Sequence, residues 1–179
     1  KEPVGLFLID TSSITISDWK VMQLNGSLGV SSVQSAVQID DDILFMDATG
    51  SIQVQSGIDN FNITGSNLSQ VKQMNVFVSD FVNRDELSHV RAVFYPTKRE
   101  VHFAVPQLED NLNTARLVLD LNHSDMPRFR WSDRDVCEAL WLRKDSAGVP
   151  RLVCGDDNGF VWLMDQSVRS KDGAGYLAE

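Results

Sequence analysis

The chain has three histidines, and their spacing bears on whether a metal or acid–base site is encoded. His89, His102 and His123 lie far apart and show none of the short spacings typical of zinc ligands. A G-x-S-x-G nucleophile motif is absent, as are the glycine-rich loops that bind phosphates. Carboxylates are numerous, but no pair stands out as acid and base. The sequence therefore predicts a non-enzymatic protein with no cofactor and no metal.

The segment 154–165 partly matches a calcium loop of the EF-hand type. Four of its residues fall at positions 3, 5, 6 and 12 of such a loop: Asp156, Asn158, Gly159 and Asp165. Position 1, however, would be Cys154, a poor ligand for a hard cation. Asn158-Gly159 is also a strong hairpin signal, because both residues tolerate positive φ. We therefore favour a hairpin turn over a calcium site.

A second acidic segment places three carboxylates side by side, at Asp40, Asp41 and Asp42. These carboxylates could bind a cation, but a solvated loop is the better interpretation because the segment separates two apolar runs. The next such turn is 47–50, where Gly50 is expected to close a hairpin.

Four tryptophans could line a groove for a sugar or a peptide: Trp19, Trp131, Trp141 and Trp162. Trp141 and Trp162 lie in apolar runs and are expected in the core or between packed sheets. Trp131 lies in the segment RFRW, where charged and aromatic residues alternate. We therefore expect Trp131 to be a partly exposed interface residue.

Cys137 and Cys154 are the only cysteines. One disulfide between them is possible, but two buried reduced thiols are the better interpretation, because cysteine is a common core residue. They form no C-x-x-C pair, so neither a zinc site nor a redox site is supported.

The composition is that of an ordinary globular domain. The 179 residues are 42% apolar and 23% charged, and the net charge is −9. An acidic surface repels phosphate backbones, which argues against general nucleic-acid binding. Membrane insertion is not expected either, since no apolar run approaches the roughly 18 residues that a spanning helix needs.

Short apolar runs alternate with turn residues along most of the chain, which is typical of a sandwich, barrel or propeller. Strands are expected at 5–9, 14–16, 35–39, 43–46, 51–55, 90–95, 100–105, 115–121, 128–131, 136–143, 150–154 and 160–164. The region 56–83 is polar, and a short helix over 68–78 fits its apolar spacing, although 76–78 also fits a strand.

Two features favour β-propeller blades among these all-β architectures. Several expected strands are continuously apolar (LFLI, ILFM, FVWLM), as in sheets covered on both faces, whereas half-exposed sheets alternate. A pattern of apolar strand, Asp- or Gly-bearing turn and second strand also recurs, in FLIDTSSITI, LFMDATGSIQV and LVCGDDNGFVWLMD. We expect roughly three to four antiparallel blades or partial blades, too few for ring closure, joined by one short helical bridge.

The order of these motifs resembles that of propeller-like structural proteins of bacteriophage tails, the nozzle and DNA-stabilising proteins of short-tailed phages. The matching pieces are GVSSV at 29–33, LFMDATG at 44–50, AVFYP at 92–96 with its partner 101–105, the strand 117–121 followed by Trp131, and LVCGDDNGFV at 152–161. The first piece lacks the proline that often follows its glycine, and Trp162 stands where a plainer strand is usual.

The resemblance implies a virion tail component, made in the host cytoplasm. Its partners would be other tail or connector proteins and further copies of itself, in a ring through which DNA passes without sequence-specific binding. The candidate interface or channel residues are Trp131, Asp40, Asp41, Asp42, Glu109 and Asp110.

The alternative is a peptide- or sugar-binding propeller. A propeller hydrolase or lyase, with clustered histidines and carboxylates, is the rival class. We expect residues 1–165 to be one β domain of a longer protein and 166–179 to be a polar tail.

Overall fold

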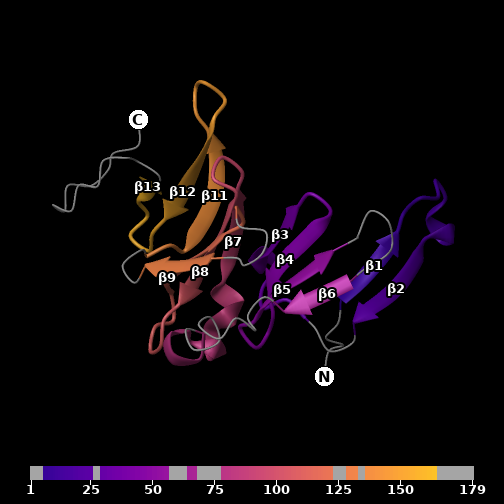
Figure 1. Ribbon diagram of the computed structural model, residues 1–179, viewed down its shortest axis with the longest axis horizontal. Coiled ribbons are helices and arrows are strands. Elements are labelled where there is room, and N and C mark those ends of the chain that lie inside the picture. The colour runs from indigo at the N-terminus through magenta and orange to yellow at the C-terminus, as the bar shows by residue number, and fades with distance from the viewer. Residues whose placement is uncertain are drawn as a thin grey trace.

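The computed structural model describes residues 6–25, 29–56, 64–67, 78–122, 128–132 and 136–164. These residues form four antiparallel sheets, so the all-β expectation is confirmed (Figure 1). Within the described part, every strand pairs only with strands adjacent to it in the sequence. None of the four sheets closes into a barrel.

The first two sheets come from the N-terminal half of the chain. A two-stranded sheet joins β1 (Leu6–Asp10) and β2 (Lys20–Asn25). A four-stranded meander follows, with the strands β3 (Ala36–Ile39), β4 (Asp42–Met46), β5 (Ile52–Ser56) and β6 (Thr64–Asn67).

The C-terminal half supplies the other two sheets. One is a second four-stranded meander of β7 (Arg91–Tyr95), β8 (Glu100–Pro106), β9 (Asn113–Asp120) and β10 (Arg128–Ser132). The other has three strands, β11 (Ala139–Lys144), β12 (Pro150–Gly155) and β13 (Val161–Leu163).

Short helical turns connect the strands. Three are 3₁₀ helices, η1 (Ile16–Asp18), η2 (Val33–Ser35) and η4 (Arg84–His89), and residues 78–81 form a helical turn. Ser32 and Ser35 cap η2 reciprocally, which satisfies backbone groups at its start. Most of the predicted helix at 68–78 lies outside the described residues, as does the predicted tail at 166–179.

The main core lies between the two four-stranded sheets. The register of sheet β7–β10 sets Phe103 opposite Ala92 and Leu117, and Val101 opposite Phe94 and Leu119, so these side chains share one face. They pack against Leu44, Met46, Ile52 and other residues of sheet β3–β6 in one apolar cluster. Burial of this surface is the main force holding the two sheets together.

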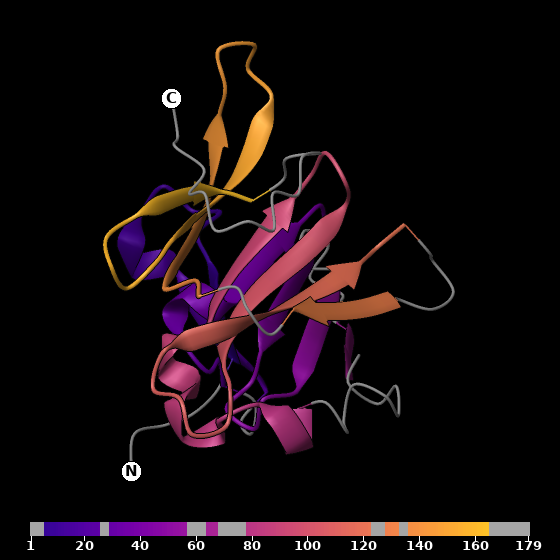
Figure 2. The ribbon, with the colours of Figure 1, turned by 90° about the vertical axis from the view of Figure 1, so that its left-hand side faces the viewer.

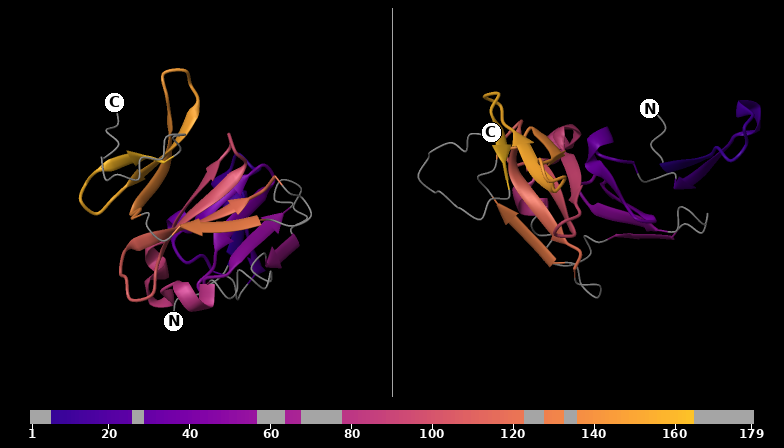
Figure 3. Two further views of the ribbon diagram at one scale, coloured as in Figure 1. Left: turned by 60° about the vertical axis from the view of Figure 1, so that its left-hand side comes forward. Right: turned by 90° about the horizontal axis from the view of Figure 1, so that it is seen from above.

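The four sheets follow one another in chain order (Figure 3). The strand β7 links three of them, because it lies close both to β3 and to β11. A second, smaller cluster of Ala104, Leu140, Cys154 and their neighbours joins sheet β7–β10 to sheet β11–β13. Both cysteines lie in it as buried, reduced thiols, as the sequence predicted.

One turn is built the same way three times, at β4–β5, β11–β12 and β12–β13. In each, an aspartate accepts hydrogen bonds through Oδ1 from the backbone N–H groups two and four residues later, and a glycine three residues later has positive φ. This geometry is a type I turn closed by a left-handed residue. The three aspartates are Asp47, Asp145 and Asp156, and the three glycines are Gly50, Gly148 and Gly159.

In each turn, the second carboxylate oxygen accepts from the side chain six residues after the aspartate. Asp145 binds Arg151 Nε at 2.9 Å, Asp156 binds Trp162 Nε1 at 2.7 Å, and Asp47 binds the amide of Gln53. Hydrogen bonding, led by the Val149 N–H, lowers the pKa of Asp145. Desolvation raises the pKa of Asp156, but the bonds from Trp162 and the backbone outweigh it and the net shift is downward.

One predicted strand was wrong, and two observed strands, β2 and β6, were not predicted. Residues 14–16 are not a strand; β1 pairs with β2, and the connection holds η1. Local hydrogen bonds hold this connection instead: Ser13 Oγ donates to the Asp18 carboxylate, and Trp19 Nε1 donates to the Ser13 carbonyl. The sequence also failed to predict β6, a polar strand that is paired with β5.

Candidate interaction surfaces

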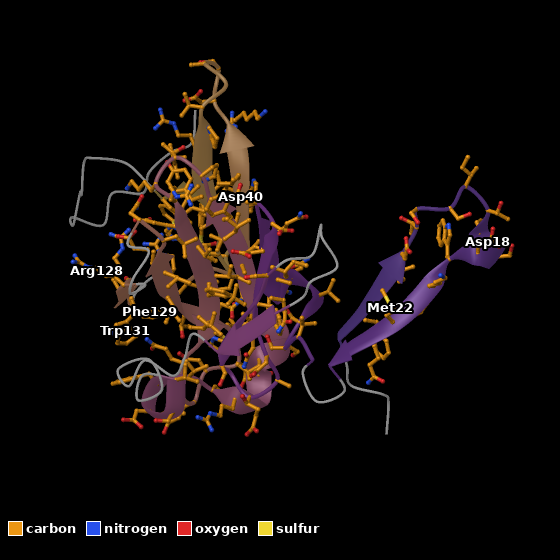
Figure 4. The ribbon with its side chains drawn as sticks, turned by 45° about the vertical axis from the view of Figure 1, so that its right-hand side comes forward. Asp18, Met22, Asp40, Arg128, Phe129 and Trp131 are labelled. Carbon is orange, nitrogen blue, oxygen red and sulfur yellow. The ribbon has the colours of Figure 1, made fainter. Side chains whose placement is uncertain are left out.

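The hairpin β1–β2 projects from the rest of the molecule (Figures 1 and 4). Its register sets Ile9 opposite Val21 on one face, and Met22 lies on the other. Ile9 is 54% exposed and Val21 is 65% exposed, and further large apolar side chains are exposed on the hairpin and its tip: Phe7, Ile14, Ile16, Trp19 and Met22. Large exposed apolar side chains gathered on one element are a common sign of an interaction surface.

The sheet β11–β13 also has an outward apolar face. Its inner face packs on Ala104 through Leu140 and Cys154. The register places Trp141, Val153, Val161 and Leu163 on the opposite face, where Trp141 and Val161 are exposed and Val153 is buried. Trp141 lies over Gly155, where an added Cβ would come within 3.6 Å of the indole ring. Trp141 is therefore an exposed residue, and the prediction that it lies in the core or between sheets was wrong.

The prediction that the apolar strands are buried on both faces holds in the inner sheets but not in the first and last sheets. In β4, Leu44, Phe45 and Met46 are consecutive and all buried, and every residue of β8 is buried. Two other apolar runs contain exposed side chains, Phe7 and Ile9 in β1 and Val161 in β13, and these strands belong to the first and last sheets in chain order. Both ends of the sheet series therefore carry exposed apolar side chains, and Phe81, Leu108 and Trp131 expose further apolar surface between them.

A buried polar cluster lies on the face of sheet β7–β10 turned toward β11–β13. Glu100 accepts from His102 Nε2 at 3.1 Å and from Arg130 through its other carboxylate oxygen, and the Tyr95 ring meets His102 edge-on. Glu100 and His102 are almost completely buried, whereas Arg130 is largely exposed. A buried carboxylate held by two partners in this way fixes the sheet and offers little access to a substrate.

The predicted interface residue Trp131 lies near the end of β10 and is 39% exposed, so its predicted partial exposure is confirmed. Its ring lies 5.2 Å from that of Phe81, which is also exposed. The Phe81 carbonyl accepts a hydrogen bond from Leu108 N, which brings the 107–112 loop alongside. Glu109 and Asp110, two other predicted interface residues, are part of this loop.

The remaining predicted residues lie elsewhere. Asp40 has φ 52° in the two-residue turn between β3 and β4, with Asp41 beside it and Asp42 at the start of β4. Figure 4 shows Asp40 apart from the β10 residues Arg128, Phe129 and Trp131. Gly50, Asn158 and Gly159 lie in hairpin turns as predicted.

Sequence reasoning missed Phe81, Glu100 and the outward position of Trp141. Phe81 lies in a polar region and far from Trp131 in the sequence, so no local pattern marks their contact. Of the three histidines, His102 binds Glu100 and His89 lies 3.5 Å from Glu86, while His123 lies outside the described residues.

Among the described residues, no three His, Cys, Asp or Glu side chains are grouped so as to hold a metal ion. In the same part of the chain, no helix has the length and apolar character needed to cross a membrane. No protein-family model matches the chain, and no curated protein matches it.

Proposed function

We propose that the chain is a non-enzymatic structural module that assembles with further copies of itself and with neighbouring proteins, in the manner of a propeller-like component of a phage tail. The observation that carries this proposal is the exposure of large apolar side chains at both ends of the sheet series, while β4 and β8 in the inner sheets are buried on both faces. Such end surfaces are suited to contact with another protein.

The arrangement of the sheets supports the propeller-like part of the proposal. Blades of a propeller are antiparallel meanders that follow one another in chain order around an axis. Here the first strands of three successive sheets lie close together, β7 beside both β3 and β11. Figure 2 shows the sheet β7–β10 in front of the sheet β3–β6, with the sheet β11–β13 above them. The chain order of the described sheets, with hairpin β1–β2 first and sheet β11–β13 last, supports a blade-like arrangement of this kind.

Two different end surfaces favour a head-to-tail contact between copies. A contact between unlike surfaces generates a ring when the rotation closes. The apolar ribbon of β1–β2 on one copy would then cover the outward face of β11–β13 on the next. The tail setting is supported by the order of motifs, which resembles that of phage tail proteins. The net charge of −9 also suits a DNA channel, because an acidic lining repels the DNA phosphates and lets the DNA pass.

The test is a pair of variants with one disabled end each. We expect native mass spectrometry to show oligomers of the unmodified chain. Ile9→Lys with Val21→Lys disables the hairpin, and Val161→Lys disables the sheet, so each variant alone should be monomeric. Mixed together, they should form a one-to-one dimer through the two intact ends. Val33→Lys is the matched control, because Val33 is 92% exposed on η2, away from both ends.

The outcomes separate the alternatives. A chain that is monomeric at high micromolar concentration, and binds no neighbouring tail protein, refutes the proposal. Variants that fail to complement each other refute the head-to-tail contact. Flanking portal or tail genes would support the tail setting, and their absence would favour a different assembly.

A further inference from the structure

We propose that Asn158 is a site of spontaneous deamidation, controlled by the turn that holds it, and that its conversion to isoaspartate opens the hairpin β12–β13. An asparagine followed by glycine deamidates readily, because glycine has no side chain to hinder attack by its own backbone nitrogen. Asn158, Gly159 and Phe160 are all exposed, and a Cβ at Gly159 would meet nothing within 4 Å. The reaction needs no enzyme, since water is the only other reactant.

The chemistry is a cyclisation followed by a hydrolysis. The backbone nitrogen of Gly159 loses its proton to hydroxide and attacks Cγ of Asn158. A Cγ–N bond forms, the Cγ–Nδ2 bond breaks, and ammonia leaves after taking a proton from water. Water then opens the cyclic imide. Opening at the main-chain carbonyl carbon of Asn158 gives isoaspartate, in which the main chain runs through Cβ, whereas opening at Cγ gives aspartate.

The closed turn holds both reacting groups. The Gly159 N–H donates to the Asp156 carbonyl, and Asn158 Nδ2 donates to Asp157 Oδ1 at 2.9 Å. Asp156 Oδ1 also accepts from the N–H groups of Asn158 and Phe160, at 3.0 Å and 2.8 Å. Attack requires the Gly159 N–H to be released and the backbone at Asn158 to rotate. The rate of deamidation therefore follows the fraction of time for which this turn is open.

This turn has the longest closing bond of the three aspartate turns. The bond from the glycine N–H to the aspartate carbonyl measures 3.0 Å at Gly50 and 2.9 Å at Gly148, but 3.3 Å at Gly159. The last value lies beyond the usual range of an N–H···O bond. The residue before the glycine is Thr49 or Ala147 in the other two turns, so this geometry does not require asparagine there. The third turn alone has a reactive amide at that position.

Isoaspartate disturbs the turn in two ways. It adds a main-chain atom between Asp156 and Phe160, so the bond from the Phe160 N–H to Asp156 Oδ1 loses its fixed span. It also places a new carboxylate beside Asp156 and Asp157, and like charges repel. The exposed residue Val161 begins β13 directly after this turn. The consequence for assembly rests on the proposed function: a reacted chain should lose the contact made by sheet β11–β13.

The test is peptide mapping by mass spectrometry of the folded chain, incubated at neutral and mildly alkaline pH. We expect Asn158 to react about tenfold or more faster than Asn111, an exposed asparagine followed by leucine. Trp162→Phe removes the bond from Trp162 Nε1 to Asp156 Oδ2 and should speed the reaction about two- to tenfold, because loss of a hydrogen bond favours the open turn. Arg151→Met is the matched control, since it removes the corresponding bond in the turn β11–β12 and should leave the rate at Asn158 unchanged.

The outcomes are distinct. Equal rates at Asn158 and Asn111, or a rate at Asn158 that Trp162→Phe does not raise, would overturn the proposal. Asn158→Asp carries the added charge on an unaltered main chain, so the isoaspartate chain should have a lower urea midpoint than this variant. Equal midpoints would overturn the opening of the hairpin.

Native mass spectrometry then compares the aged chain with the aged Asn158→Ala variant, which has alanine before the glycine as turn 145–148 does. We expect the aged chain to lose oligomers and Asn158→Ala to keep them. Equal oligomer loss in the two aged chains would overturn the consequence for assembly. If the fresh chain is already monomeric, the proposed function fails, whereas the mapping and the urea midpoints still decide the deamidation.

Discussion

The three turn glycines allow backbone conformation and packing to be measured separately. Gly50, Gly148 and Gly159 have φ of 84°, 78° and 83°, so an alanine at any of them meets the same left-handed backbone penalty. That penalty is about 1–2 kcal/mol, partly offset by about 0.4–1 kcal/mol from the less flexible unfolded chain. Each exposed turn should therefore lose about 1 kcal/mol on substitution by alanine.

Gly50 differs because its turn is covered. A Cβ there would lie 2.9 Å from Val78 Cγ1 and 3.8 Å from Leu87 Cδ1, whereas a Cβ at Gly148 or Gly159 would meet nothing within 4 Å. Overpacking of a well-filled site adds about 1–3 kcal/mol. We therefore expect Gly50→Ala to lower the free energy of unfolding by about 2–4 kcal/mol.

Urea unfolding followed by tryptophan fluorescence measures all three variants. Gly148→Ala and Gly159→Ala should show similar, small shifts in midpoint, and Gly50→Ala a much larger one. In a Val78→Ala background, which removes the methyl group that clashes, the additional loss from Gly50→Ala should fall to that of the exposed turns. Equal losses at all three glycines, or an undiminished Gly50→Ala loss without Val78, would refute the reasoning.

Other predictions concern the buried and hydrogen-bonded groups. The folded-state pKa of Asp145 and Asp156 lies below the ordinary 3.8, so their stabilisation is complete above that pH and is lost as the pH falls through the folded-state value. Replacing both by Asn should flatten the acid limb of a stability–pH curve, and an unchanged limb would assign it to other carboxylates. Glu100→Gln should lower the free energy of unfolding by about 1–3 kcal/mol in urea titrations, because it weakens a buried charged network. Glu109→Gln, on an exposed loop, should change it by less than about 0.5 kcal/mol. Ellman's reagent should react with the two buried thiols only as the chain unfolds; fast labelling of the folded protein would contradict their burial.

The turns and most strands were predictable because their signals are local. Asn158-Gly159 and the segment 47–50 carry the conformational preferences of their turns within a few residues. Ile14 and Ile16 misled because β-branched residues favour strands, yet Ser13 and Asp18 bind locally and bend the chain there. The strand β6, with the sequence TGSN, has little preference of its own and is held by its pairing with β5.

The candidate surfaces were less predictable because they depend on register and on which sheet lies next. Trp131 was identified from its charged surroundings, but its partner Phe81 comes from a distant segment. Trp141 and Val161 have the apolar neighbours of core residues, and only the position of their sheet at the end of the series leaves one face uncovered. The faces to which Glu100 and Arg130 point follow from the pairing of β8, β9 and β10, which the sequence does not specify.

Pairing only between consecutive strands has a consequence for how the chain is made. Among the described strands, each sheet can complete its hydrogen bonds as soon as its last strand leaves the ribosome, because none of these strands pairs with one that is distant in the sequence. Chains with such local contacts fold quickly for their size. The hairpin β1–β2 would form first and expose its apolar faces throughout synthesis, whereas docking at β7 requires both neighbouring sheets. The exposed apolar side chains of this hairpin are therefore made before the later sheets exist, and contacts between nascent chains on one polysome can compete with correct folding.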